Sequence, residues 1–182
     1  MSTTLLQAIE TLNRGGIIAY PTEAVYGLGC RADDRAAVER LCALKQRPVE
    51  QGVIVLVHDL GQLGDWIVPL DTDQQASLQL TWPGPVTWLI PTTEHCPAWL
   101  TGRHSSLAVR QSSHPLCRQL CAELNVPLVS TSANRSGEEP ARSALEAQQI
   151  FGDSIDLVLD APLGDSDTPS AIFDLQTGEQ IR

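Results

Sequence analysis

Short apolar runs alternate with helical stretches along this chain, and that alternation restricts its fold more than any other feature. Strands are predicted at 17–20, 53–57, 86–90, 107–110, 127–130, 156–159 and 171–175. Helices are predicted at 5–12, 34–44, 114–124 and 143–152, and residues 58–80 carry weaker helical signals. Strands that alternate with helices favour an α/β fold, here a twisted mixed β-sheet flanked by helices.

Capping and turn residues indicate where several of these elements begin. Asp33 or Asp34 is predicted to cap the second helix, because a short polar side chain accepts hydrogen bonds from the free N–H groups of the first turn. Ser143 with Glu146 is predicted to form a capping box. The Trp-Pro-Gly-Pro run at 82–85 is predicted to form a rigid turn before a strand.

Length and composition fit one domain, residues 1–182. The chain is 42% hydrophobic and shows no internal repeat or linker. Its apolar runs are shorter than the roughly 18 residues of a membrane span, and its N-terminus lacks the basic and apolar regions of a secretory signal. Five cysteines without a C-x-x-C pair signal neither a disulfide framework nor a thiolate zinc site. We therefore expect a cytoplasmic protein with no membrane partner, with Cys117 and Cys121 on the apolar face of a helix.

Acidic residues outnumber basic ones by 22 to 12, which gives a formal charge of −10. Such a charge argues against a surface built mainly to hold nucleic acid phosphates, so an anionic ligand must meet a local basic site. Lys45 is the sole lysine, and every other basic side chain is an arginine. Arginine-rich codon usage explains most of this bias but does not explain why one lysine remains.

Polar clusters follow four of the predicted elements, and ligands of α/β sheets gather where loops leave the sheet. The clusters are P-T-E-A-V-Y-G-L-G at 21–29, K-Q-R-P at 45–48, P-G-P-V-T at 83–87 and S-T-S-A-N at 130–134. The first is interpreted as a glycine-rich turn in which Gly27 and Gly29 let a ligand approach the backbone. It is neither a dinucleotide fingerprint nor a Walker A loop.

Lys45 and Arg47 stand where a helix ends, so both charges are predicted to project into the loop before the strand at 53–57. One interpretation is that they interact with the carbonyls of the helix C-terminus, worth about 0.3–1 kcal/mol each. The other is a triphosphate clamp, in which lysine is a mobile point charge and arginine a planar fork. The solitary lysine favours the clamp.

The Ser/Thr/Asn run at 130–134 suits hydrogen bonds to phosphate, ribose or carboxylate, and equally suits a capped turn. Arg110 ends an apolar strand, where a cation needs a ligand carboxylate or an acidic neighbour. The four histidines show no H-x-x-x-H spacing and there is no G-x-S-x-G elbow, so no metal site is predicted.

Taken together, P-T-E-x-x-Y-G-L-G, K-x-R-P, P-G-P-x-T and S-T-S-A-N-x-S-G resemble the YrdC/TsaC family, the threonylcarbamoyl-AMP synthases, over nearly the whole chain. The tail S-A-I-F-D at 170–174 and Arg182 resemble the closing serine and arginine of that family. Ala24, Gly52 and Leu56 depart from residues common in relatives, which points to the short bacterial form. The resemblance also implies that the extra C-terminal domain of longer relatives is absent.

The resemblance implies a nucleotidyltransferase with a YrdC-like fold. It would join L-threonine, bicarbonate or CO2 and ATP into threonylcarbamoyl-AMP and release pyrophosphate, for modification of tRNA beside the anticodon by a separate transferase complex. Lys45 and Arg47 would face the ATP phosphates as the catalytic pair. Two groups of residues would bind substrates: Ser132, Asn134, Thr87 and Arg182 for the nucleotide, and Thr22, Arg110, Ser130 and Ser170 for threonine.

Attack on an α-phosphorus needs two anions held together and a leaving pyrophosphate neutralised, which cations and hydroxyls supply. Mg²⁺ is expected with ATP, held mainly by phosphates and water, and no organic cofactor is expected. Two other function classes stay open at this stage. One is an RNA-binding module, weakened by the bulk acidity. The other is carbamoyl transfer, because YrdC-like domains occur in hydrogenase-maturation proteins.

Overall fold

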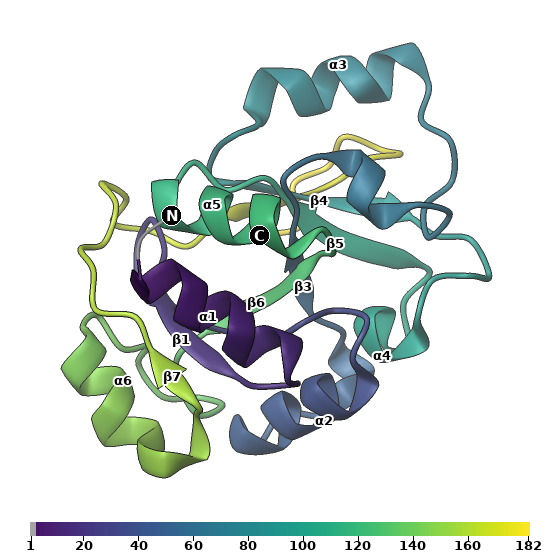
Figure 1. The fold of residues 1–182 in the computed structure, drawn as a ribbon. Coiled ribbons are helices and arrows are strands. Elements are labelled where there is room, and N and C mark those ends of the chain that lie inside the picture. The colour runs from purple at the N-terminus through teal and green to yellow at the C-terminus, as the bar shows by residue number, and fades with distance from the viewer. Residues whose placement is uncertain (1–2) are drawn as a thin grey trace.

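The computed structural model describes residues 3–182, which form one continuous eight-stranded mixed sheet with helices on both faces (Figure 1). The strand order is β7-β1-β2-β6-β3-β5-β4-β8. The strands are β1 (Ile18–Pro21), β2 (Tyr26–Gly29), β3 (Ile54–Leu56), β4 (Val86–Pro91), β5 (Ser106–Arg110), β6 (Leu128–Ser132), β7 (Leu157–Val158) and β8 (Ala171–Asp174). The predicted fold class, a mixed sheet flanked by helices, is confirmed.

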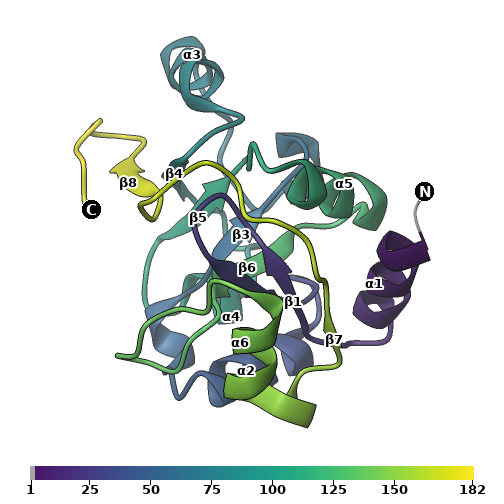
Figure 2. The same cartoon turned by 90° about the vertical axis from the view of Figure 1, so that its left-hand side faces the viewer.

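Two helical layers cover the sheet (Figure 2). The helices are α1 (Thr3–Asn13), α2 (Arg35–Leu44), α3 (Thr72–Thr81), α4 (Ala98–Thr101), α5 (Pro115–Leu124) and α6 (Ala144–Phe151), with short 3-10 turns η1 (Val49–Gln51), η2 (Leu60–Leu63) and η3 (Gly152–Ser154). Helices α1 and α5 share one apolar cluster with β1, to which Cys117 and Cys121 belong as predicted. The larger cluster lies on the other face and includes residues of α2, α4 and α6.

The glycine-rich segment at 21–29 is the main correction to the predicted elements. Tyr26–Gly29 is not part of a turn but is a fully buried strand, β2, between β1 and β6. A Cβ atom at Gly29 would lie 2.7 Å from the Val129 carbonyl oxygen and 2.8 Å from Cε1 of Tyr20. Glycine is therefore required here by close packing of the neighbouring strands rather than by a turn.

Two further predicted details differ from the structure. Strand β6 runs to Ser132, two residues beyond the predicted end, so the S-T-S hydroxyls lie on the sheet itself. The capping box at α6 is half formed: the Ser143 side chain accepts from the Glu146 N–H, but the Glu146 carboxylate accepts from the Arg142 N–H instead of closing the box. Asp34, by contrast, caps α2 as predicted.

The turn at 82–85 joins α3 to β4 and is tied to the end of β5. The Gly84 N–H donates to the Gln111 carbonyl at 2.9 Å, and Nε of Arg110 donates to the Gly84 carbonyl at 3.0 Å. These bonds fix Arg110 at the end of a central strand. Among residues 3–182, no helix is long and apolar enough to cross a membrane.

We expect Gly29→Ala to lower the free energy of unfolding by about 1–3 kcal/mol, because the added methyl group meets a backbone oxygen that cannot move aside. Gly27→Ala is the matched control two residues away on the same strand. Its Cβ would meet nothing closer than 3.3 Å, so it should cost less. Urea denaturation of both variants measures the difference, and equal losses would contradict the packing argument.

Candidate active site

A pocket of about 540 Å³ opens over the central strands, where β2, β6, β3 and β5 lie side by side. Seven of the ten predicted site residues line it: Thr22, Arg47, Arg110, Ser130, Ser132, Ser170 and Arg182. They come from five separate stretches of the chain, and the sheet brings them to one place. The other three, Lys45, Thr87 and Asn134, lie directly behind this lining, as the hydrogen bonds below show.

Lys45 connects the end of α2 to the end of β6. Its side chain is 3% exposed, and Nζ donates to the carbonyls of Ser132 and Asn134, the latter at 2.8 Å, and to Oδ1 of Asn134 at 3.2 Å. The prediction that this charge projects into the loop before β3 is therefore wrong, because the carbonyls at the end of β6 offer it a buried site. Burial, with the nearby Arg47 charge, lowers the pKa of Lys45 to about 8.

Arg47 reaches toward β3, as predicted, and carries an unused donor. Its Nη2 donates to the Gly52 carbonyl at 2.8 Å, while Nε is buried without a hydrogen-bond partner among the described residues. A buried guanidinium N–H without an acceptor is costly. Arg47 as a residue lines the pocket, so its guanidinium brings a positive charge to this wall.

The S-x-N motif lies at the end of β6 and in the loop that follows, where Asn134 makes the hydrogen bonds that the capped-turn interpretation predicts. Its use for ligand binding stays a prediction. The Ser132 hydroxyl donates to Oδ1 of Asn134 at 2.5 Å. Nδ2 of Asn134 donates to the carbonyls of Arg135 and Glu138 at 2.9 and 2.8 Å. Asn134 thus organises its own loop and also presents an acceptor to Lys45.

The C-terminal segment contributes the remaining pocket wall through β8. The hydroxyls of Thr87 and Ser170 are hydrogen-bonded at 2.9 Å, so fully buried Thr87 connects with the pocket through Ser170. Nη2 of Arg182 donates to the Ser170 carbonyl at 3.2 Å, and the Ile172 N–H donates to the Arg182 carbonyl at 2.9 Å. These bonds hold the last residue at the pocket edge.

Arg110 has an acidic partner that the sequence motifs alone did not assign to it. Nη2 of Arg110 lies 2.6 Å from Oε1 of Glu23, and both side chains are about nine-tenths buried. The same oxygen accepts from the Ser112 hydroxyl and the Ser113 N–H at 2.8 and 2.9 Å. Burial would raise the pKa of the Glu23 carboxyl, but the Arg110 charge and these hydrogen bonds outweigh it and leave the pKa below its usual value. The position of Arg110 at the end of an apolar strand had indicated an acidic neighbour or a ligand carboxylate, but the sequence did not show that this neighbour is Glu23.

Two hydroxyls of the pocket have their roles fixed by neighbours. The buried Tyr20 hydroxyl donates to Oγ of Ser130 at 2.7 Å, so the Ser130 proton remains free to donate elsewhere. The Thr22 hydroxyl donates to the Val25 carbonyl at 2.7 Å, so toward a ligand it can act as an acceptor. Tyr20 is thus a supporting residue that the motif analysis missed.

The pocket contains no ready cage for a metal ion. Within residues 3–182, no group of three or more His, Cys, Asp or Glu side chains could hold one. Glu23 is the single carboxylate among the described lining residues, and it is paired with Arg110. Any cation would therefore have to enter with ligands of its own, such as nucleotide phosphates.

Comparison with known proteins decides the family. The profile of the Sua5, YciO and YrdC proteins, described as "Telomere recombination", matches residues 10–182. The chain belongs to this family. It is 52% identical to the threonylcarbamoyl-AMP synthase of Chromohalobacter salexigens over 98% of this chain and 96% of the relative. The predicted family and its activity, threonylcarbamoyl-AMP synthesis, are thereby confirmed.

Two solved family structures share the fold. E. coli YciO superimposes with a TM-score of 0.82 at 28% identity, covering 98% of this chain and 87% of YciO. P. abyssi Sua5, solved in complex with L-threonine, superimposes with a TM-score of 0.89 at 29% identity over 97% of this chain. This chain spans 52% of the length of that Sua5 chain.

We expect Glu23→Gln to lower the free energy of unfolding by about 3–5 kcal/mol at pH 7, because it leaves the Arg110 charge buried and unpaired. The Glu23 pKa is lower in the folded than in the unfolded chain, so its contribution is present above the ordinary value of 4.5. The contribution is lost as pH falls through the folded pKa. The difference between wild type and variant, measured in urea, should therefore shrink below pH 4.5.

Asp33→Asn is the matched control, because Asp33 pairs with Arg31 at 2.7 Å in a more exposed setting. It should cost about 0–1 kcal/mol. A Glu23→Gln variant that is as stable as the Asp33→Asn control would refute the buried pair.

Proposed function

We propose that this pocket makes threonylcarbamoyl-AMP and pyrophosphate from L-threonine, bicarbonate or CO2, and ATP. The observation that carries the proposal is that Arg47 and Arg182, from distant segments, line one pocket in a chain of formal charge −10, beside Arg110, which Glu23 neutralises. A concentration of positive charge in an acidic molecule indicates a site for anions. Lys45 stands directly behind the same wall.

The nucleotide end is assigned to Lys45, Arg47, Ser132 and Asn134, with Thr87 and Arg182 beside them. Neutral carbonyl and amide oxygens hold the Lys45 ammonium, so its charge is not cancelled by a carboxylate. Arg47 adds a second positive charge to this wall. Uncompensated charge is what a triphosphate requires, because it must neutralise the pyrophosphate that leaves.

The threonine end is assigned to Thr22, Arg110 and Ser130, with Ser170. Arg110 is already paired with Glu23, so this end of the pocket is close to neutral and suits a zwitterionic amino acid. The Ser130 hydroxyl can donate a hydrogen bond to the threonine carboxylate, and the Thr22 hydroxyl oxygen can accept one from the threonine hydroxyl.

The reaction divides into two bond-forming steps. The threonine amine, once deprotonated, attacks the carbon of CO2 and loses a proton, or attacks bicarbonate with loss of water, and either route gives a carbamate. A carbamate oxygen then attacks the α-phosphorus as the bond to the pyrophosphate oxygen breaks. The protein's role is to position the two anions and neutralise charge. Mg²⁺ enters with ATP as part of the substrate, held by phosphates and water.

By the same resemblance, the product serves a separate transferase complex that modifies tRNA, and the enzyme works in the cytoplasm. The threonylcarbamoyl adenylate is a mixed anhydride that water can hydrolyse, so a pocket that excludes water protects it until it is transferred.

The experiment is pyrophosphate release from MgATP by the purified protein. Release should require both L-threonine and bicarbonate. Lys45→Ala or Arg47→Ala should each lower turnover by about 100-fold or more, because each removes a charge that neutralises the leaving group. Arg118→Ala is the control, since Arg118 is exposed on α5 and does not line the pocket, and it should leave turnover unchanged.

ATP consumption that is indifferent to threonine would reject the proposal. RNA affinity at low and moderate salt, without adenylate formation, would favour the nucleic-acid alternative instead. Pyrophosphate-free turnover of carbamoyl phosphate would favour carbamoyl transfer.

The lowered Lys45 pKa predicts how ATP binding responds to pH. The ammonium loses its proton as pH rises through about 8, so ATP affinity should fall above that pH, by at most about tenfold per pH unit. In Lys45→Arg the charge does not titrate in this range, so its ATP affinity should be weaker at pH 7 but flat from pH 7 to 9. Calorimetric titration with ATP measures both proteins, and parallel pH profiles would contradict the assignment.

A further inference from the structure

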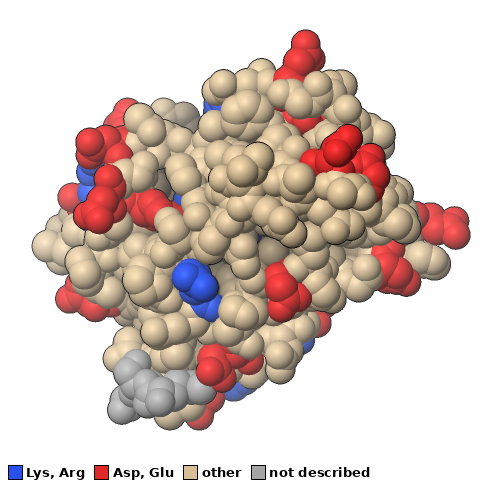
Figure 3. Space-filling model, turned by 90° about the horizontal axis from the view of Figure 1, so that it is seen from above, with Lys and Arg blue, Asp and Glu red and all other residues tan. Residues whose placement is uncertain are grey.

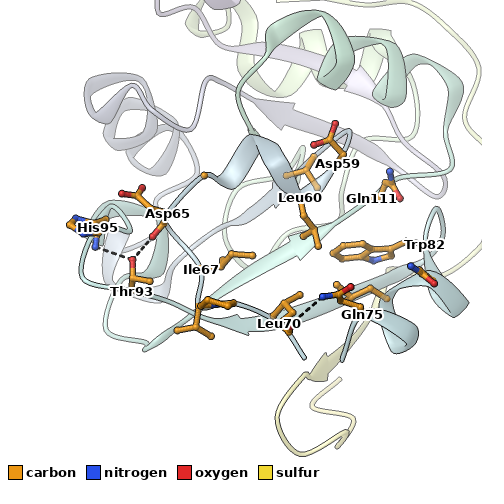
Figure 4. A pocket seen from close by; sticks show the side chains of 16 residues that line it. Asp59, Leu60, Asp65, Ile67, Leu70, Gln75, Trp82, Thr93, His95 and Gln111 are labelled. Carbon is orange, nitrogen blue, oxygen red and sulfur yellow. Dashed lines mark hydrogen bonds between the residues drawn. The ribbon is translucent and has the colours of Figure 1, made fainter. Parts of the chain in front are cut away.

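A second cavity of about 760 Å³ lies beneath α3, between that helix, η2 and the segment that follows β4 (Figure 4). Within the described part of the chain it shares no lining residue with the active-site pocket. Its volume falls within the range of small-molecule sites, roughly 300–1,000 Å³. Neither the motifs nor the proposed reaction uses it.

The walls of this cavity, called here the α3 cavity, have a definite chemistry. Leu60, Ile67 and Leu70 point into the same space as the Trp82 ring (Figure 4). Nε1 of Trp82 donates to the Val86 carbonyl at 2.8 Å, which fixes the ring and leaves its polar edge satisfied. A fixed indole on an apolar wall suits a flat apolar group.

The formal charges around the α3 cavity are of one sign. Asp59 and Asp65 line it, and among its described lining residues there is no Lys or Arg. Figure 3, which views this end of the molecule from above, shows more acidic than basic side chains on a largely uncharged surface. Phosphates and carboxylates are therefore disfavoured here, and a positively charged group is favoured.

Helix α3, which covers the cavity, makes few buried contacts with the rest of the protein. Of its ten residues, Leu78 alone is buried, and Leu80 is 87% exposed. Figures 1 and 2 both show the helix standing away from the rest of the fold. Since most helix stability in proteins comes from packing, a ligand beneath α3 would supply contacts that the chain itself does not.

The α3 cavity adjoins the active site through hydrogen bonds. Gln111 lines the cavity and is the neighbour of Arg110 in sequence, and its carbonyl accepts from the Gly84 N–H at 2.9 Å. The Gly84 carbonyl in turn accepts from Nε of Arg110 at 3.0 Å. Trp82, on the cavity wall, begins the same turn. A ligand that shifts Trp82 therefore acts on a carbonyl that holds Arg110.

We propose that the α3 cavity binds a small organic cation with a flat apolar body and that this binding alters the affinity for threonine. The apolar body lies against Trp82, and the cationic end faces Asp59 or Asp65. Coupling arises because the turn at 82–85 contacts both sites. The coupling rests on the assignment of Arg110 to threonine under the proposed function, whereas the binding itself does not.

The test uses three indoles that differ in charge: tryptamine, 3-methylindole and indole-3-acetate. In calorimetric titrations of the whole protein, tryptamine should bind more tightly than 3-methylindole by about twofold to fivefold, the scale of an exposed ion pair. Indole-3-acetate should bind more weakly than either. Equal affinity for all three, or no binding of tryptamine, would overturn the proposal.

Variants locate the binding. Asp59→Asn with Asp65→Asn should abolish the preference for tryptamine over 3-methylindole, and asparagine retains the oxygen with which Asp59 caps η2. Glu94→Gln is the control, because this exposed acid lies beside the cavity without lining it. Trp82→Leu should weaken the binding of all three indoles, because it removes the flat ring against which they lie. Retention of the preference in the double variant, or of full affinity in Trp82→Leu, would place the ligand elsewhere and reject the site.

Coupling is measured by titrating threonine with and without saturating tryptamine. The affinity for threonine should change by at least about twofold, and threonine should change the affinity for tryptamine by the same factor. Binding of tryptamine with no such change would reject the effector role. If threonine binds but no adenylate forms from MgATP and bicarbonate, the proposed function fails while the coupling result stands.

Discussion

The pocket wall depends on one hydrogen-bonded contact, which the ammonium of Lys45 makes between two motifs that are far apart in the sequence. Lys45 follows the last residue of α2, and its Nζ donates to the carbonyls of Ser132 and Asn134 at the end of β6. A buried cation needs oxygen partners, and the strand end supplies them without a carboxylate. The result is a structural contact that leaves a net positive charge beside the pocket. The same contact fixes the S-x-N loop, and under the proposed function it places the charge beside the ATP phosphates.

Charge is arranged unevenly across the pocket, and under the proposed function this arrangement suits two different substrates. At one end Arg110 is cancelled by Glu23, which suits a zwitterion. At the other end Lys45 and Arg47 are held by neutral carbonyls, which suits a polyanion. Because the sheet sets these two ends side by side, the amino acid and the nucleotide would meet at their reacting atoms rather than compete.

Arg110 links this site to the rest of the molecule. It ends β5, and through Gly84 it contacts the turn that carries Trp82 and, beyond it, α3. The active-site pocket and the α3 cavity are thus connected through one hydrogen-bonded turn. On one side of the turn, α3 makes few buried contacts, so that side should open more easily. On the other side, the buried ion pair of Arg110 and Glu23 fixes the side chains in place.

The sequence by itself determined the α/β class, most strand and helix positions, and the caps that depend on near neighbours. Its motifs also predicted ten site residues, and seven of them line one pocket. Periodicity and local capping act within a few residues, so they can be read along the chain. Tertiary structure alone decided that the glycine-rich segment is the strand β2, that Lys45 turns toward β6, and that Glu23 is the partner of Arg110. Those outcomes depend on which strands become neighbours and on where a buried cation finds oxygen acceptors. Both are contacts between segments far apart in the sequence, and such contacts leave no periodic signal along the chain.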